Sequence, residues 1–271
     1  MIKYLLASFF ILFFTACSNK NLSVENRIQS ANNFAKQNNL EVKIISSSYF
    51  NHYIIEDKNL SCKQANIYIE GDGLAWLNKT TVSPNPTPIN QNFLELLKYD
   101  NSCKIYIARP CQYINSNSCS VEYWTNKRFS KEVIDSLDEV LNILKDKKSI
   151  EKFNLIGFSG GGAVVALIAG KRDDIENLVT IAGNLDTQKW TKLHNISPLE
   201  GSLNPSEMTS SLELTKQFHL IGNSDEIVPK EIFFSYYNKF YNKKNISYKL
   251  VNATHNCCYN DEFKIILDKI K

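Results

Sequence analysis

The 271-residue sequence predicts an α/β protein whose mostly parallel central sheet is covered by helices on both faces. After residue 40, short segments rich in β-branched and aromatic residues alternate with segments of helical periodicity. No linker divides the chain beyond that point, so we expect one domain over residues 41–271. A hydrophobic content of 43% with 22% charged residues excludes a disordered, collagen-like or coiled-coil chain.

The strands are expected where short β-rich runs meet turn-forming residues. The run at residues 65–69 leads into Gly71-Asp72-Gly73, and the run at 103–108 is stopped by Pro110. The expected strands, in order, are residues 41–47, 49–57, 65–69, 103–108, 153–158, 178–182, 218–222 and 247–251.

The clearest helix is expected at residues 130–147, where apolar residues from Val133 to Leu144 recur on one face. Ser130 is a suitable N-cap, and Glu132 lies in the first turn. The expected helices, in order, are residues 24–40, 91–99, 130–147, 163–169, 229–241 and 261–270.

The first residues are typical of an export signal. Lys3 precedes a thirteen-residue apolar run that is short for a membrane span and ends in Phe14-Thr15-Ala16-Cys17. This ending resembles the lipobox of bacterial lipoproteins, in which the cysteine becomes the lipidated first residue. The resemblance implies a signal peptide at residues 1–16, lipidation at Cys17, and a tether with an N-terminal helix over 17–40. It also implies a lipid-anchored protein of the bacterial cell envelope that faces outside the cytoplasm; the alternative is a plain secretory signal.

Export favours disulfides among the six remaining cysteines, for which 15 pairings exist. Zinc is disfavoured because two of them, Cys257 and Cys258, are adjacent and the others lack paired CxxC spacing. The net charge is +3 and no long basic run occurs, so we expect no nucleic-acid partner.

The segment Gly157-Phe158-Ser159-Gly160-Gly161 has the pattern G-x-S-x-G. An apolar strand precedes the motif and an apolar helix follows it, which is the setting of a nucleophile elbow. Larger side chains two residues before and after the serine would clash in so tight a turn. The alternative is a glycine-rich turn with a passive serine.

With this motif, residues 41–271 resemble the α/β-hydrolase family, whose catalytic triad runs Ser, acid, His along the chain. The resemblance assigns Ser159 as nucleophile and His255, directly after the last strand, as its base. His52 precedes the serine, His219 lies inside a strand, and His194 lies in an irregular region.

The acid implied by the family is Asp225, which lies after a strand in Gly222-Asn223-Ser224-Asp225-Glu226-Ile227-Val228-Pro229. Asp186 is the main rival because some relatives place the acid one strand earlier. An aspartate that satisfies the backbone of a turn is the alternative for both.

The oxyanion hole needs two N–H donors. The resemblance assigns one to Gly160 and the other to the loop after residues 65–69, where Asp72 or Gly73 could donate. Glu70 stands where the family has histidine, which leaves the donor open. The segment could also be only a sharp turn.

Residues 187–215 correspond to the insertion that often caps the site in this family, and here it is short. Trp76 is expected to form one wall, with Trp124 and Trp190 at the rim. We expect Arg109 to form a salt bridge rather than to meet a substrate carboxylate.

The family's strand order also informs the cysteines. Its third and fourth strands are neighbours, so the resemblance favours a Cys62–Cys103 disulfide. Cys111 and Cys119 could pair locally. Cys257 and Cys258 would then form a vicinal bond, or one of them could reach Cys111.

Taken together, the resemblance implies a serine hydrolase for carboxylic esters that works through an acyl-enzyme, without metal or organic cofactor. A peptidase or amidase is the enzymatic alternative, since the fold does not select the bond cleaved. A catalytically silent envelope lipoprotein that binds a ligand is the alternative from another class.

Overall fold

The computed structural model describes residues 23–271. The expected signal peptide and the lipidation site Cys17 lie outside the described residues. Within 23–271, no helix has both the length and the apolar character needed to cross a membrane.

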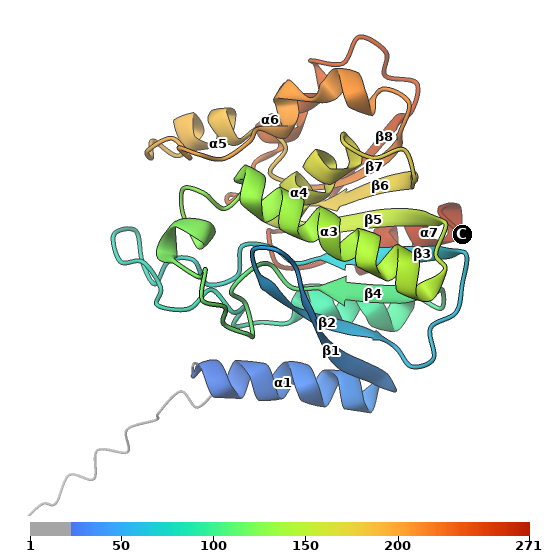
Figure 1. The fold of residues 1–271 in the computed structure, drawn as a ribbon. Helices are drawn as coiled ribbons and strands as arrows, with labels where there is room; N and C mark the ends of the chain where they lie inside the picture. Colours follow the sequence, from blue (N-terminus) through green and yellow to red (C-terminus); the bar gives the residue numbers. More distant parts are fainter. Residues whose placement is uncertain (1–22) are drawn as a thin grey trace, which may run out of the picture.

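The centre of the fold is a sheet of eight strands in the order β1-β2-β4-β3-β5-β6-β7-β8 (Figure 1). Strand β2 is antiparallel to β1 and β4, whereas all other neighbouring pairs are parallel. This confirms the mostly parallel sheet predicted from sequence. The strands are β1 (Leu40–Ser46), β2 (Asn51–Asp57), β3 (Gln64–Ile69), β4 (Lys104–Ile107), β5 (Lys152–Phe158), β6 (Ile175–Ile181), β7 (Lys216–Gly222) and β8 (Ile246–Val251).

Helices cover both faces of the sheet, as Figure 1 shows. The side chains of α3, α4 and α6 pack in one core and those of α1, α2 and α7 in the other. Along β3, Ile67 and Ile69 enter the first core and Tyr68 the second, because successive strand side chains point to opposite faces. The helices are α1 (Val24–Gln37), α2 (Asn92–Glu95), α3 (Lys131–Lys148), α4 (Gly160–Ala169), α5 (Thr187–Leu193), α6 (Lys230–Tyr237) and α7 (Asn260–Lys269).

Three predicted helices are shorter than expected. The first ends at Gln37 rather than at residue 40, because Asn38 donates its side-chain amide to Phe34 O (2.8 Å) and Asn39 turns left-handed with φ 56°. The helix expected at 91–99 is a single turn, α2, followed by a 3-10 segment. Helix α6 ends at Tyr237 rather than at residue 241.

Helix α1 belongs to the folded body. Ala31 and Phe34 pack in the same core as Tyr53 of β2, and the buried Arg27 donates to Thr87 O. Helix α1 begins at Val24, the residue at which the first helix was expected to begin.

Helix α5, within the cap segment 187–215, was not predicted. Asp186 caps its first turn by accepting a hydrogen bond from Lys189 N–H (3.0 Å). The remainder of the segment contains only short 3-10 turns, so the cap is small, as expected.

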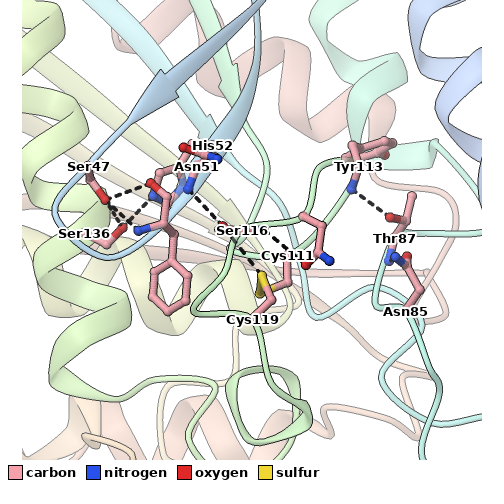
Figure 2. Close-up of a disulfide and its surroundings, with 12 residues drawn as sticks. Ser47, Asn51, His52, Asn85, Thr87, Cys111, Tyr113, Ser116, Cys119 and Ser136 are labelled. Atoms are coloured by element: carbon pink, nitrogen blue, oxygen red, sulfur yellow. Dashed lines mark hydrogen bonds between the residues drawn. A yellow bond between two sulfur atoms is a disulfide. The ribbon is translucent and has the colours of Figure 1, made fainter.

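The six cysteines in the described part of the chain form three disulfides, Cys62–Cys103, Cys111–Cys119 and Cys257–Cys258. The first joins the starts of the parallel neighbours β3 and β4 across a Cα separation of 6.5 Å, as the strand order implied. The second closes a loop that is tied to β2, because Ser116 Oγ accepts from Asn51 N–H at 3.1 Å (Figure 2). The alternative in which Cys111 pairs with a cysteine of the His255 loop is not formed.

Candidate active site

Ser159 stands in a sharp turn between β5 and α4. Its backbone is left-handed, with φ 53° and ψ −119°, and such strain is typical of functional turns. The flanking glycines are required by space, since a Cβ on Gly157 would lie 2.3 Å from Gly161 O and one on Gly161 would lie 2.2 Å from Ile69 O. The motif therefore forms the turn expected from its pattern.

Ser159, His255 and Asp225 lie in continuous hydrogen-bonding contact. His255 Nε2 is 3.0 Å from Ser159 Oγ, and His255 Nδ1 is 2.8 Å from Asp225 Oδ2. The second oxygen, Asp225 Oδ1, accepts from the backbone N–H groups of Ile227 (2.9 Å) and Val228 (2.8 Å). These contacts favour the tautomer with Nδ1–H donated to the carboxylate, which leaves Nε2 free to accept from the serine hydroxyl.

The other candidates have partners elsewhere. His219 is buried between Thr180 and Gln217, and burial lowers its pKa to about 3. Burial likewise lowers the pKa of His52, which contacts Ser136, to about 4. His194 contacts the backbone oxygen of Ile227.

The rival acid, Asp186, is the N-cap of α5 and also accepts from Ser235 Oγ at 2.7 Å. Its side chain is therefore bonded to the cap segment and to α6, and the side chain that contacts His255 is that of Asp225.

The loop after β3 touches the nucleophile through Gly71. A Cβ built on Gly71 would lie 3.4 Å from Ser159 Cβ, whereas one on Gly73 would lie 2.0 Å from Pro86 O. Of the two expected oxyanion residues in this loop, Asp72 adjoins Gly160, on which a Cβ would lie 2.0 Å from Asp72 Oδ1, and Gly73 turns towards Pro86.

Glu70 and Gln112 fix the peptide groups of this loop. Glu70 Oε1 accepts from Gly71 N–H (2.8 Å), and Gln112 Nε2 donates to Gly71 O (2.9 Å). Tyr106 donates its hydroxyl to Glu70 Oε2 at 2.8 Å. Burial raises the pKa of the Glu70 carboxyl to about 7, although the hydrogen bonds from Tyr106 and Gly71 oppose the rise.

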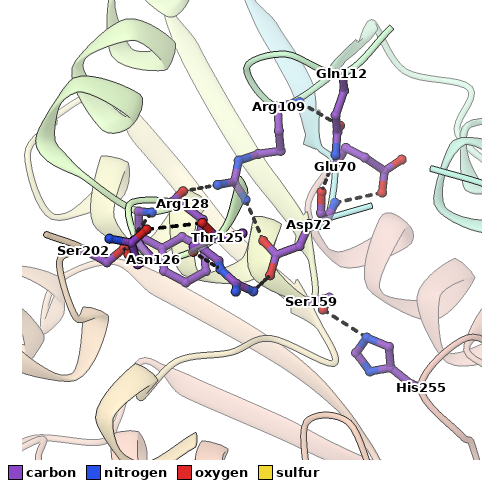
Figure 3. A network of polar contacts seen from close by, with 12 residues as sticks. Glu70, Asp72, Arg109, Gln112, Thr125, Asn126, Arg128, Ser159, Ser202 and His255 are labelled. Atoms are coloured by element: carbon purple, nitrogen blue, oxygen red, sulfur yellow. Dashed lines mark hydrogen bonds and ion pairs between the residues drawn. The ribbon is translucent and has the colours of Figure 1, made fainter. Parts of the chain in front are cut away.

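The Asp72 carboxylate lies between two buried arginines (Figure 3). Arg128 Nη1 donates to Oδ2 at 2.7 Å and Arg109 Nη1 to Oδ1 at 3.2 Å. Burial raises the pKa of Asp72, but the positive charges of Arg128 and Arg109 outweigh it and hold the pKa below its ordinary value. Arg109 is thus in the salt bridge expected from sequence.

An open cleft of about 1310 Å³ lies over Ser159 and His255. Trp76 and Trp190 line it, as expected. Trp124 does not, which corrects its expected place at the rim: it is buried in the core and donates its indole N–H to Ser83 O at 3.0 Å.

Sequence reasoning gave Glu70, Gln112 and Arg128 no role at the site. A carboxylate at the end of a buried strand is a signal for Glu70, because such a group needs dedicated partners. Nothing local marks Gln112 or Arg128, whose contacts with the loop after β3 depend on the tertiary fold.

Within residues 23–271, no group of three or more histidine, cysteine or acidic side chains is arranged to hold a metal ion.

Comparison with known proteins agrees with this architecture. A family model described as the alpha/beta hydrolase fold matches residues 98–197. No curated protein sequence matches the chain significantly.

Solved structures resemble the chain over most of its length. An esterase of Pyrococcus furiosus, Pf2001, has a TM-score of 0.62 at 16% identity and covers 87% of this chain and 93% of its own. Est1E of Butyrivibrio proteoclasticus has a TM-score of 0.59 at 14% identity, with 84% and 96% covered. An alpha-beta serine hydrolase homologue of Coxiella burnetii has a TM-score of 0.58 at 16% identity, again with 84% and 96% covered. The sheet order, the turn at Ser159 and these likenesses together establish that the chain has the α/β-hydrolase fold, as the sequence predicted.

Proposed function

We propose that this protein is a serine hydrolase that cleaves carboxylic esters. The observation that carries the proposal is the unbroken series from Ser159 Oγ through His255 to the buried Asp225 carboxylate, with contacts of 3.0 and 2.8 Å. A serine hydroxyl is a weak nucleophile until a base takes its proton, and this series supplies both the base and the group that orients it.

In the proposed reaction, Ser159 Oγ attacks the acyl carbon while His255 Nε2 takes the hydroxyl proton. The alcohol leaves with that proton, and the acyl group stays on Ser159 as an ester. His255 then deprotonates a water molecule, which releases the acid and regenerates the serine. The Asp225 carboxylate stabilises the imidazolium formed in each step.

The proposed oxyanion hole consists of the backbone N–H groups of Gly160 and Asp72. Gly160 is the first residue of α4, so its N–H has no intrahelical acceptor. The carbonyl of Gly71 accepts from Gln112, and in a trans peptide the next N–H, that of Asp72, points the opposite way. Neither N–H has a hydrogen-bond partner within residues 23–271. Glu70 and Gln112 act as positioning residues for this donor.

Esters are the preferred substrate class because the cleft is open and its rim exposes apolar side chains such as Trp76 and Ile227. The structural neighbours named as esterases agree with this choice, and one neighbour was solved with ferulic acid bound. An amide substrate would use the same three residues.

A fluorophosphonate probe tests the serine mechanism. We expect the probe to label the wild type and not Ser159→Ala, and we expect His255→Ala to lower the labelling rate strongly. Absence of labelling in the folded wild type would favour the ligand-binding lipoprotein instead. Panels of short-chain esters and of peptides then decide between esterase and peptidase.

We also propose that the chain is exported and anchored to a bacterial membrane through lipid on Cys17. The support is the sequence Phe14-Thr15-Ala16-Cys17 after a short apolar run. The wild type should sediment with membranes and Cys17→Ser should not; membrane-bound Cys17→Ser would contradict the anchor.

A further inference from the structure

Arg128 is a buried side chain with one end open to the cleft. Its Nε donates to Thr125 O (2.6 Å) and its Nη1 to Asp72 (2.7 Å), while Nη2 has no partner within the described residues. The residue is 6% exposed and lines the cleft. The guanidinium lies over the Trp190 ring, 5.7 Å from its centroid, which holds it in one orientation.

The charges around Arg128 do not balance. Arg128 and Arg109 share the single carboxylate of Asp72. The other buried acid nearby, Glu70, pairs with Tyr106 and Gly71 and forms no ion pair with either arginine. Lys79 also lines the cleft, but its side chain is exposed and solvent screens its charge. A buried guanidinium with an unused donor and incomplete charge compensation favours an anionic partner.

Arg128 lies on the side of Ser159 that is opposite His255. A Cβ built on Gly160 would lie 2.0 Å from Asp72 Oδ1, so the ion pair adjoins the residue that follows the nucleophile. Figure 3 shows Asp72 and Arg128 on one side of Ser159 and His255 on the other. The leaving alcohol must lie near His255 to receive its proton, so we place the acyl chain in the part of the cleft that Arg128 and Trp190 line.

We propose that Arg128 forms an anion-binding subsite that receives a carboxylate at the far end of the acyl chain, so that the enzyme prefers half-esters of dicarboxylic acids. This inference rests on the proposed esterase function. Hydrolysis of such a half-ester consumes one water and yields the dicarboxylate, the alcohol and one proton.

The test on the wild type compares two isosteric substrates. Monoethyl adipate carries a terminal carboxylate, and its matched control carries a terminal carboxamide in the same place. We expect kcat/KM to be at least about tenfold higher for the carboxylate, as a charge-assisted hydrogen bond implies. The preference should fall as ionic strength rises. The comparison is repeated with half-esters and matched carboxamides that carry two to five methylene groups, so that the result does not depend on one chain length.

Variants then assign the preference to one side chain. Arg128→Gln should reduce the carboxylate-to-carboxamide ratio of kcat/KM to near one, and Arg128→Lys should restore part of it. Lys79→Gln, which removes an exposed positive charge from the same cleft, should change the ratio by less than about twofold because an exposed charge is screened.

The outcomes separate the two proposals. If the wild type hydrolyses the carboxamides as well as or better than the carboxylates at every chain length, the subsite is wrong and the esterase stands. An unchanged preference in a folded Arg128→Gln would also overturn the subsite. If neither series is hydrolysed and the fluorophosphonate probe does not react, both proposals fail.

Discussion

The two carboxylate oxygens of Asp225 contact different groups. One oxygen holds the imidazole of His255, and the other accepts two backbone N–H groups of its own loop. The carboxylate is thereby fixed against the fold while it orients the base. Removing its charge alone, without changing its size, isolates the orienting role.

We expect Asp225→Asn to lower kcat for ester hydrolysis by about 10³–10⁴-fold, because an amide in that place favours the wrong histidine tautomer. Asp186→Asn is the matched control: its side chain caps α5, so its kcat should stay within about threefold of the wild type. Initial rates with a chromogenic ester measure both. Equal losses in the two variants would contradict the assignment.

Glu70 gives the protein a characteristic dependence of stability on pH. Its pKa is raised by burial to about 7 from an ordinary value of 4.5. Between these values the folded form holds a proton that the unfolded form has released. Its contribution to the free energy of unfolding therefore declines as pH rises through that window, by up to about 3 kcal/mol.

Urea denaturation at pH 4.5 to 8 checks this effect. The difference in unfolding free energy between wild type and Glu70→Gln should change across the window and be constant above it. Parallel curves for the two proteins would show that the Glu70 carboxyl titrates normally.

Among single residues, the sequence predicted those that a local sequence pattern marks. Ser159 stands in a five-residue pattern, and Asp225 and His255 follow strands in the expected order. Arg128 and Gln112 could not be predicted, since their contacts with Gly71 and Asp72 join loops distant in sequence.

Helix α4 is the element on which the nucleophile depends. Every residue from Gly160 to Ala169 is buried, so the helix has no face in solvent. In the proposed reaction its first N–H group, that of Gly160, donates to the oxygen of the carbonyl that Ser159 attacks. The position of the helix therefore determines the position of the donor at Gly160.

We expect Leu167→Ala, in the middle of α4, to lower the free energy of unfolding by about 2–5 kcal/mol through the cavity it leaves. The rate per folded molecule should change little, because Leu167 lies far along the helix from Ser159. Chemical denaturation measures the free energy of unfolding. Titration with the fluorophosphonate probe counts the active molecules, and dividing the rate of ester hydrolysis by this number gives the rate per folded molecule.

The elements with strong periodicity were predicted most closely. Helix α3 was expected at 130–147 and spans Lys131–Lys148. Helix α5 was missed because Thr187–Leu193 has almost no apolar periodicity and is held by its Asp186 cap and by tertiary contacts. The end of α1 depends on Asn38 and Asn39, whose left-handed turn the apolar pattern does not encode.

At the scale of the whole molecule, the disulfides differ in how much chain they close. Cys62 and Cys103 are separated by 41 residues, whereas Cys111 and Cys119 are separated by 8. Loop entropy predicts stabilisation of about 4 and about 2.6 kcal/mol respectively, because the longer loop restricts the unfolded chain more.

We therefore expect the double variant Cys62→Ser/Cys103→Ser to lose more stability than Cys111→Ser/Cys119→Ser. Thermal denaturation without reductant measures the melting temperatures of the two double variants and of the wild type. The order of the two melting temperatures is the decisive quantity, and its reversal would show that the Cys62–Cys103 bond contributes less than its loop length implies.

Ile227 joins the acid loop to the cap. Its N–H is held by Asp225 Oδ1, while its carbonyl accepts from Trp190 Nε1 (2.7 Å) and His194 Nε2 (2.9 Å) of the cap segment. A single residue thus couples the acid loop to the cap, and an outward displacement of α5 would disturb the carboxylate that aligns His255. We therefore expect α5 to stay in place while substrate enters through the open cleft.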